Sequence, residues 1–120
     1  MNLIKSNIED LENNPVMLYK MTRGKNTVSV NKMDDEQLDR DYSVVGYALY
    51  ADVNSKGEDV EILSLLTESG LILAAQSKTF KDSFFDILGM VGDRDFSIKV
   101  DSGTSKSGRR YMDCELTSVG

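Results

Sequence analysis

The sequence predicts a small, mainly antiparallel β protein, a Greek-key barrel with one inserted helix. Two observations lead to this fold class. Short runs of apolar and β-branched residues recur between turn residues, which is typical of strands joined by tight turns. The apolar period then changes to that of an amphipathic helix over 80–91, and two further strand-like runs follow. At 120 residues the chain has the size of one domain and can bury a core without disulfides or metals.

The first part of the chain is predicted to hold a short helix and a hairpin. Ser6 and Glu9 have the spacing of a capping box, so one or two helical turns are expected over 6–13. Pro15 ends them, because the residue before a proline avoids the helical region. Two strand-like runs with a loop between them follow, over 16–21 and 27–33 with the loop at 23–26.

The middle of the chain is predicted as a charged connector, a long strand and a second hairpin. The connector over 34–41 is rich in acids, but their spacing matches no EF-hand loop, so we interpret it as a solvated link with at most one helical turn. The strand over 43–53 has apolar residues on both parities, which indicates that both of its faces are partly covered. A turn leads to the hairpin, with the turn at 54–57 and strands over 60–67 and 71–76.

The last part is predicted as the amphipathic helix followed by a final hairpin. The aromatic residues of the helix recur at helical spacing, and we interpret them as packing on the sheet: Phe80, Phe84 and Phe85. The hairpin strands are expected over 96–100 and 109–116, around a glycine-bounded turn.

Composition removes several classes of site. The chain has no histidine and one cysteine, Cys114, so it lacks the imidazole of Ser/His and Cys/His nucleophile systems and cannot form a Cys-rich zinc site. Cys114 alternates with Met112 and Leu116, which favours a packed core thiol. We therefore predict no enzyme, no metal and no cofactor, although an unmotifed carboxylate pair stays open. No run is long enough to span a membrane and no signal-peptide segment is present, so a cytoplasmic location is expected.

The net charge of −6 argues against a nucleic-acid partner, but the charges are unevenly distributed. Four cations and no acid lie over 16–32, and four cations with one acid lie over 99–111. The acids collect in two other runs, over 34–41 and 58–61. Because salt screens charges beyond about 8 Å, a local basic surface can still bind nucleic acid on an acidic protein.

Three segments in a fixed order resemble a known family. They are ILSLLTESG over 62–70, SKTF over 77–80 before the aromatic helix, and GTSKSGR over 103–109 with Tyr111. In this order, over roughly 43–116, they are similar to the small OB-fold single-stranded-DNA-binding proteins of phages and conjugative elements of Gram-positive bacteria. The resemblance implies a five-stranded barrel with its helix between the third and fourth strands, and sequence-tolerant binding of single-stranded DNA. The sequence has no tryptophan, unlike the better-known bacterial members, and recruitment of partners through an acidic C-terminal tail is not expected.

The final hairpin supplies the first group of candidate binding residues. Alternation places Lys99, Arg109 and Tyr111 on its outward face, where a tyrosine beside cations suits base stacking. Lys106 and Arg110 can reach phosphates from the turn. The competing interpretation is a tyrosine that covers a barrel end and loop cations that are merely solvated.

A second group of candidates lies outside that hairpin. Lys20, Arg23 and Lys25 form a second basic patch, and the sequence leaves open whether it adjoins the first. Lys78 precedes the helix and could contact a phosphate there. Tyr47 is taken to face a ligand from the long strand, with core packing as the competing fate.

The first functional hypothesis is a sequence-tolerant single-stranded-DNA-binding protein used in phage or plasmid DNA replication, recombination or transfer. Replication or recombination proteins are expected partners, and an exposed barrel edge would permit self-association. The alternative is a protein-binding module on the same fold, such as a phage-encoded inhibitor or adaptor of a host factor, because an acidic surface can mimic DNA.

Overall fold

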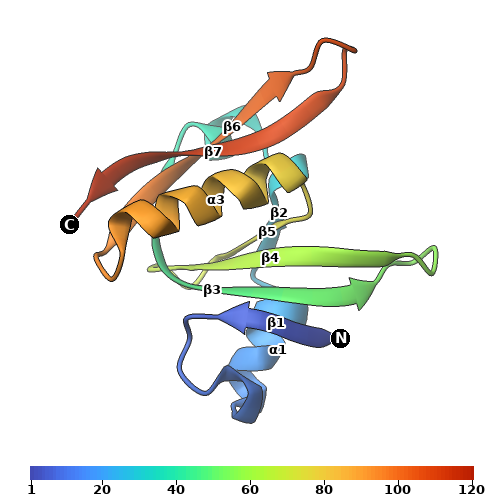
Figure 1. The fold of residues 1–120 in the computed structure, drawn as a ribbon, viewed down its shortest axis with the longest axis vertical. Coiled ribbons are helices and arrows are strands. Elements are labelled where there is room, and N and C mark those ends of the chain that lie inside the picture. The colour runs from blue at the N-terminus through green and yellow to red at the C-terminus, as the bar shows by residue number, and fades with distance from the viewer.

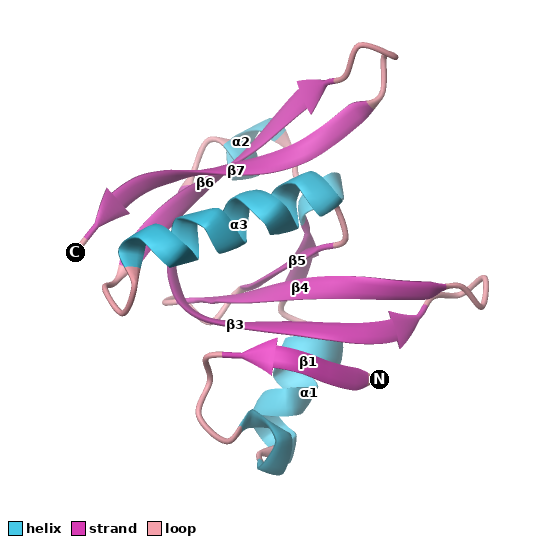
Figure 2. Cartoon of the chain, viewed as in Figure 1, coloured by secondary structure: helices cyan, strands magenta, loops and turns pink.

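The computed structural model describes residues 1–120 and shows a mainly β protein (Figures 1 and 2). Seven strands form one curled sheet with the shape of a half-barrel, and three α-helices accompany it. The strands are β1 (Asn2–Ser6), β2 (Thr27–Ser29), β3 (Asp41–Val53), β4 (Asp59–Thr67), β5 (Ile72–Ala75), β6 (Phe96–Thr104) and β7 (Arg110–Val119). The helices are α1 (Pro15–Arg23), α2 (Asp35–Leu38) and α3 (Lys78–Val91), with 3-10 turns η1 (Leu11–Asn13) and η2 (Val30–Lys32). None of these helices combines the length and apolar character that crossing a membrane requires.

The long strand β3 joins the parts of the sheet. The strand order is β2-β5-β4-β3-β6-β7, with β1 also paired to β3, and only the β2–β5 pair is parallel. Along one edge β3 pairs with β6 near its start and with β1 farther on, while β4 follows the other edge. A register shift occurs near Gly46, where a Cβ atom would lie 2.9 Å from Ile8 Cγ1. Since β5 and β7 are not paired, the sheet curls without closing.

Helix α3 fills the concave side of this sheet and completes the main core. It lies between β7 and the β3–β4 part of the sheet (Figure 1). Its buried face packs against inward side chains of the strands, with Phe80, Phe84, Ile87 and Val91 from the helix. Each fully buried side chain of this size contributes about 1.5–3 kcal/mol. This packing confirms that Phe80 and Phe84 belong to the core, and Phe85 packs against it while partly buried.

A smaller cluster covers the other face of β3. Helix α1 and η1 place Met21 and Leu11 against Ala48 of β3 and Ile72 of β5. Next to Ala48 along the strand, Tyr47 and Leu49 point into the main cluster instead. The prediction that both faces of this strand are covered is confirmed.

The predicted elements from the charged connector onward are confirmed. The connector forms the single helical turn α2, and the next three strands are β3, β4 and β5. Ser77 caps α3, because its Oγ accepts a hydrogen bond from the Phe80 amide at 3.3 Å. The final hairpin is β6–β7, longer than predicted at both strands.

The predictions for the first 33 residues were wrong, except that the start of the strand expected over 27–33 is present as β2. The run over 16–21 is helix α1 and not a strand, because Asn14 caps it by accepting a hydrogen bond from the Met17 amide and Pro15 stands at its first position. The expected helix over 6–13 is reduced to η1, and Ser6 ends β1 instead of capping a helix. No hairpin forms over 16–33, since β2 pairs in parallel with β5.

Candidate nucleic-acid interface

The β6–β7 hairpin carries the residues that the sequence singled out first. Its register pairs Gly103 with Tyr111 and Thr104 with Arg110, so β7 begins at Arg110 and Arg109 belongs to the turn instead of the predicted strand. The turn lies at one end of the molecule, away from the core (Figure 1). The inward side chains are buried as alternation predicts: Phe96, Ile98, Val100, Met112 and Cys114.

Tyr111 forms a supported aromatic surface at the base of this turn. A Cβ atom on Gly103 would overlap the phenol end of Tyr111, so the ring lies across the Gly103 backbone on the neighbouring strand. The glycine therefore lets the aromatic ring cover the strand, a pairing known to stabilise β-hairpins. The Tyr111 side chain stays 39% exposed, which leaves part of the ring available to a ligand.

Three cations without carboxylate partners precede this ring in the hairpin turn and at the start of β7. Lys106, Arg109 and Arg110 are exposed and form no ion pair. The turn is held by its own hydrogen bonds, in which the Ser105 amide donates to the Arg109 carbonyl at 2.8 Å and the Gly108 amide to the Ser105 carbonyl at 2.9 Å. The side chains of the three cations are therefore free to contact an anion.

Lys99 does not join this cationic tip. Its Nζ lies 3.5 Å from Asp39 Oδ1, and its side chain is only 34% exposed. Lys99 and Tyr111 share the outward face, as predicted, but Asp101 and Asp113 lie opposite each other between them. The outward face of the hairpin is therefore acidic, and the positive charge is confined to the turn.

The second predicted patch lies elsewhere on the molecule. Lys20 and Arg23 belong to the last turn of α1, and Lys25 follows it. Arg23 is paired with Asp52, with 3.3 Å between Nη2 and Oδ2. Helix α1 stands at the opposite end of the molecule from the β6–β7 turn (Figure 1). The two basic patches are thus separate and do not form one groove.

Tyr47 belongs to the core. Its side chain is 8% exposed, and its ring makes edge contacts with Phe84 at 5.7 Å and Phe85 at 5.5 Å between ring centroids. Both ring contacts are therefore made within the core, and little of Tyr47 reaches the surface. The competing interpretation of Tyr47 from the sequence, that it packs in the core, agrees with the structure.

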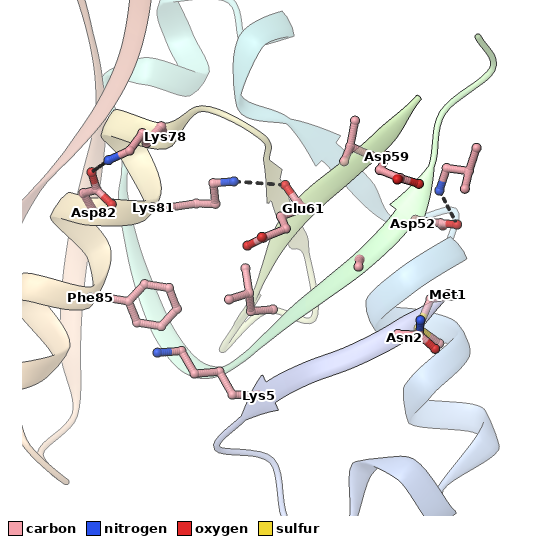
Figure 3. Close-up of a pocket in the computed structure, with 14 residues that line it drawn as sticks. Met1, Asn2, Lys5, Asp52, Asp59, Glu61, Lys78, Lys81, Asp82 and Phe85 are labelled. Carbon is pink, nitrogen blue, oxygen red and sulfur yellow. Dashed lines mark hydrogen bonds and ion pairs between the residues drawn. The ribbon is translucent and has the colours of Figure 1, made fainter. Parts of the chain in front are cut away.

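Lys78 lines a groove in the surface, which we call the α3 groove. This groove of about 860 Å³ runs between α3 and the strands β1, β3 and β4 (Figure 3). Lys78 Nζ donates to Asp82 Oδ2 at 2.6 Å, and this hydrogen bond and the carboxylate charge raise the pKa of Lys78. Lys78 is the one predicted cation that lines this groove.

The sequence did not point to the other charged and aromatic residues of the α3 groove. Lys81 Nζ donates to the Glu61 carbonyl at 3.2 Å, and Lys5 Nζ lies 4.0 Å from the centroid of the Phe85 ring. Lys78, Lys81 and Phe85 are spaced to share one helix face, a signal that was available. The position of Lys5 depends on the pairing of β1 with β3, for which the sequence has no local signal.

A second, smaller cavity of about 310 Å³ adjoins the hairpin. Its lining residues come from η2, the start of β7 and the residue before α3: Asn31, Arg110, Tyr111, Met112 and Ser77. Ser77 connects these elements, because its Oγ donates to the Met112 carbonyl at 3.1 Å while it caps α3. The cationic turn is thereby tied to the beginning of the helix.

The predicted cations fall into two groups, those with an ion pair and those without one. Those without an ion pair are Lys20, Lys25, Lys106, Arg109 and Arg110, whereas Arg23, Lys78 and Lys99 are paired. Only the β6–β7 turn brings unpaired cations and a supported, exposed aromatic ring together in one hairpin. Comparison of the chain with protein-family models, curated proteins and solved structures found no match.

Proposed function

We propose that this protein binds single-stranded DNA with little sequence preference, using the β6–β7 turn as its main contact. The observation that carries the proposal is the set of three unpaired cations, Lys106, Arg109 and Arg110, in the hairpin that also carries the exposed ring of Tyr111. Cations that follow a phosphate backbone and an aromatic ring that stacks on bases are the two components of sequence-tolerant single-strand binding. No catalytic step is part of this function.

The strand order supports an OB-fold interpretation. The order β5-β4-β3-β6-β7, with α3 joining the third strand along the chain to the fourth, matches the connectivity that the family resemblance implies. In OB folds the loops after the first and fourth strands contact oligonucleotides, and the β6–β7 turn corresponds to the second of these. Helix α1 covers the outer face of β3, so a ligand would approach from the side of the turns.

Charge sets the expected strength of binding. Each neutralised phosphate changes log K by about −0.7 per unit of log salt for single strands, so three contacts predict a slope near −2. The net charge of −6 opposes a polyanion at long range. We therefore expect binding that is clear at low salt and declines steeply as salt rises.

A titration of labelled oligo-dT at low and high salt tests the proposal. Combined Lys106→Ala, Arg109→Ala and Arg110→Ala substitutions should remove most of the affinity and flatten the salt slope. The matched control is Lys20→Ala with Lys25→Ala, which removes unpaired cations from the other end of the molecule and should change little. Absence of binding at micromolar protein and low salt would exclude the proposed function.

A second candidate is the protein-binding module. It is favoured by the outward face of the hairpin, where Asp101, Asp113 and Glu115 surround the paired Lys99. Such a surface suits a basic partner. This candidate would be selected if the protein retains a defined host protein, loses it on charge reversal at Asp101 and Asp113, and binds no oligonucleotide.

A further inference from the structure

We propose that the bound strand continues from the β6–β7 turn past the start of α3 into the α3 groove, and that this groove favours cytosine over thymine. This inference rests on the proposed function and extends the binding site to residues that the turn does not contain. The structure offers four observations for it: two cavities lined by consecutive residues, a cationic wall, an aromatic platform and a carboxylate wall.

The route is inferred from the positions of the two cavities, which are lined by consecutive residues at the start of α3. Ser77 lines the small cavity together with Arg110 and Tyr111, and the next residue, Lys78, lines the α3 groove. The start of α3 and the turns of the β6–β7 and β3–β4 hairpins lie on the same side of the molecule (Figure 1). A strand that leaves Tyr111 therefore reaches the groove without crossing the core.

The cationic wall consists of Lys78 and Lys81 on α3 and Lys5 on β1. Lys81 contacts only a backbone carbonyl, that of Glu61, so its charge is not neutralised by a carboxylate. The Lys78–Asp82 pair is largely exposed, and exposed pairs are weak enough for a phosphate to compete with them. This wall can therefore hold the phosphates of the strand.

Phe85 provides the aromatic platform. Its ring packs by edge contacts on Tyr47 and Phe84, and Lys5 Nζ lies over the ring at 4.0 Å (Figure 3). A base that stacks on Phe85 takes the place of this ammonium group. Lys5, displaced from the ring, is then available to pair with a phosphate. The contact between Lys5 and Phe85 is thus replaced by a base stacked on Phe85 and a phosphate paired with Lys5.

The carboxylate wall is formed by Asp59 and Glu61 of β4, across the groove from α3 (Figure 3). Neither side chain forms an ion pair. Both repel phosphates, which keeps the backbone on the lysine wall and turns the bases toward β4. Carboxylates accept hydrogen bonds from the exocyclic amino group of cytosine, whereas thymine presents a carbonyl oxygen at that position. The preference for cytosine follows from this difference.

The test compares oligo-dC with oligo-dT of equal length in the same buffer near pH 8. We expect oligo-dC to bind about tenfold more tightly, the discrimination of one good base contact. Glu61→Gln should bring the two affinities close together while leaving the backbone contact of Lys81 intact. Glu115→Gln, the same charge change on the hairpin face, should preserve the preference.

A second measurement separates the groove from the turn. Lys5→Gln with Lys81→Gln should reduce the magnitude of the salt slope by about 1.4, the share of two phosphate contacts that add to the slope near −2 expected from the three turn cations. If binding is sensitive to the turn cations but unchanged by these two substitutions and by Glu61→Gln, the groove is not part of the site and the proposed function stands. If neither oligonucleotide binds, both proposals are overturned.

Discussion

Replacing Tyr111 by alanine tests whether the ring at the hairpin turn stacks on bases. The ring covers Gly103 across the β6–β7 pair and is 39% exposed. Truncation of an aromatic stacking residue costs about 1–3 kcal/mol per base, which corresponds to a loss of about 5- to 150-fold in affinity. A cross-strand pair of this kind contributes only about 0.2–1 kcal/mol to stability, so the fold should persist.

The assay is fluorescence anisotropy of labelled oligo-dT at low salt, with thermal unfolding measured for each variant. Tyr111→Phe should retain the affinity, because the phenol hydroxyl has no hydrogen-bond partner in the protein and the ring is kept. Tyr19→Ala is the matched control, since Tyr19 is a 53% exposed tyrosine on α1, away from the turn. Full affinity in a folded Tyr111→Ala protein would refute the stacking role.

Two further predictions concern stability. Gly46→Ala should lower the free energy of unfolding in urea by about 1–3 kcal/mol, because the added Cβ atom would lie 2.9 Å from Ile8 Cγ1. Gly89→Ala, at a helix position with open space around it, should instead raise the free energy of unfolding by about 0.5–1 kcal/mol. Equal effects of the two substitutions would contradict the packing around Gly46. Burial, and secondarily the charge of Asp113, raises the pKa of Cys114 from 9.0 to about 12. The thiol therefore ionises at a lower pH in the unfolded chain than in the folded protein. The stability that comes from this difference in pKa should be lost as the pH rises from 9 to 12. Cys114→Ala should make the free energy of unfolding less dependent on pH in this range.

The elements with strong local signals were predictable. The helical period around Phe80 and Phe84 stands out from the strand pattern, and Gly70 and Gly108 mark turns that need positive φ angles, 91° and 83°. The inward and outward sides of β7 followed from alternation alone. Local chemistry decides these features because the partners lie close along the chain.

The errors near the N-terminus have two different causes. The residues of α1 include Val16 and Tyr19, which favour strands by composition, but the Asn14–Pro15 pair is a helix-start signal that outweighs them. Strand β1 had no comparable signal, since it exists through pairing with the middle of β3, more than forty residues away. A strand of this kind depends on a partner that composition does not reveal.

For the candidate site, the sequence by itself determined which side chains could bind a strand: an uneven charge distribution, a glycine-bounded cationic turn and a tyrosine beside it. Only the tertiary structure decided which of them act together. It pairs Lys99 with Asp39, removes Tyr47 into the core, and separates α1 from the hairpin. It also brings Lys5 over Phe85, eighty residues away in the chain, to form the α3 groove. The physical reason is that residue type sets charge and stacking capacity, whereas ion pairing and burial depend on neighbours supplied by strand pairing and helix packing.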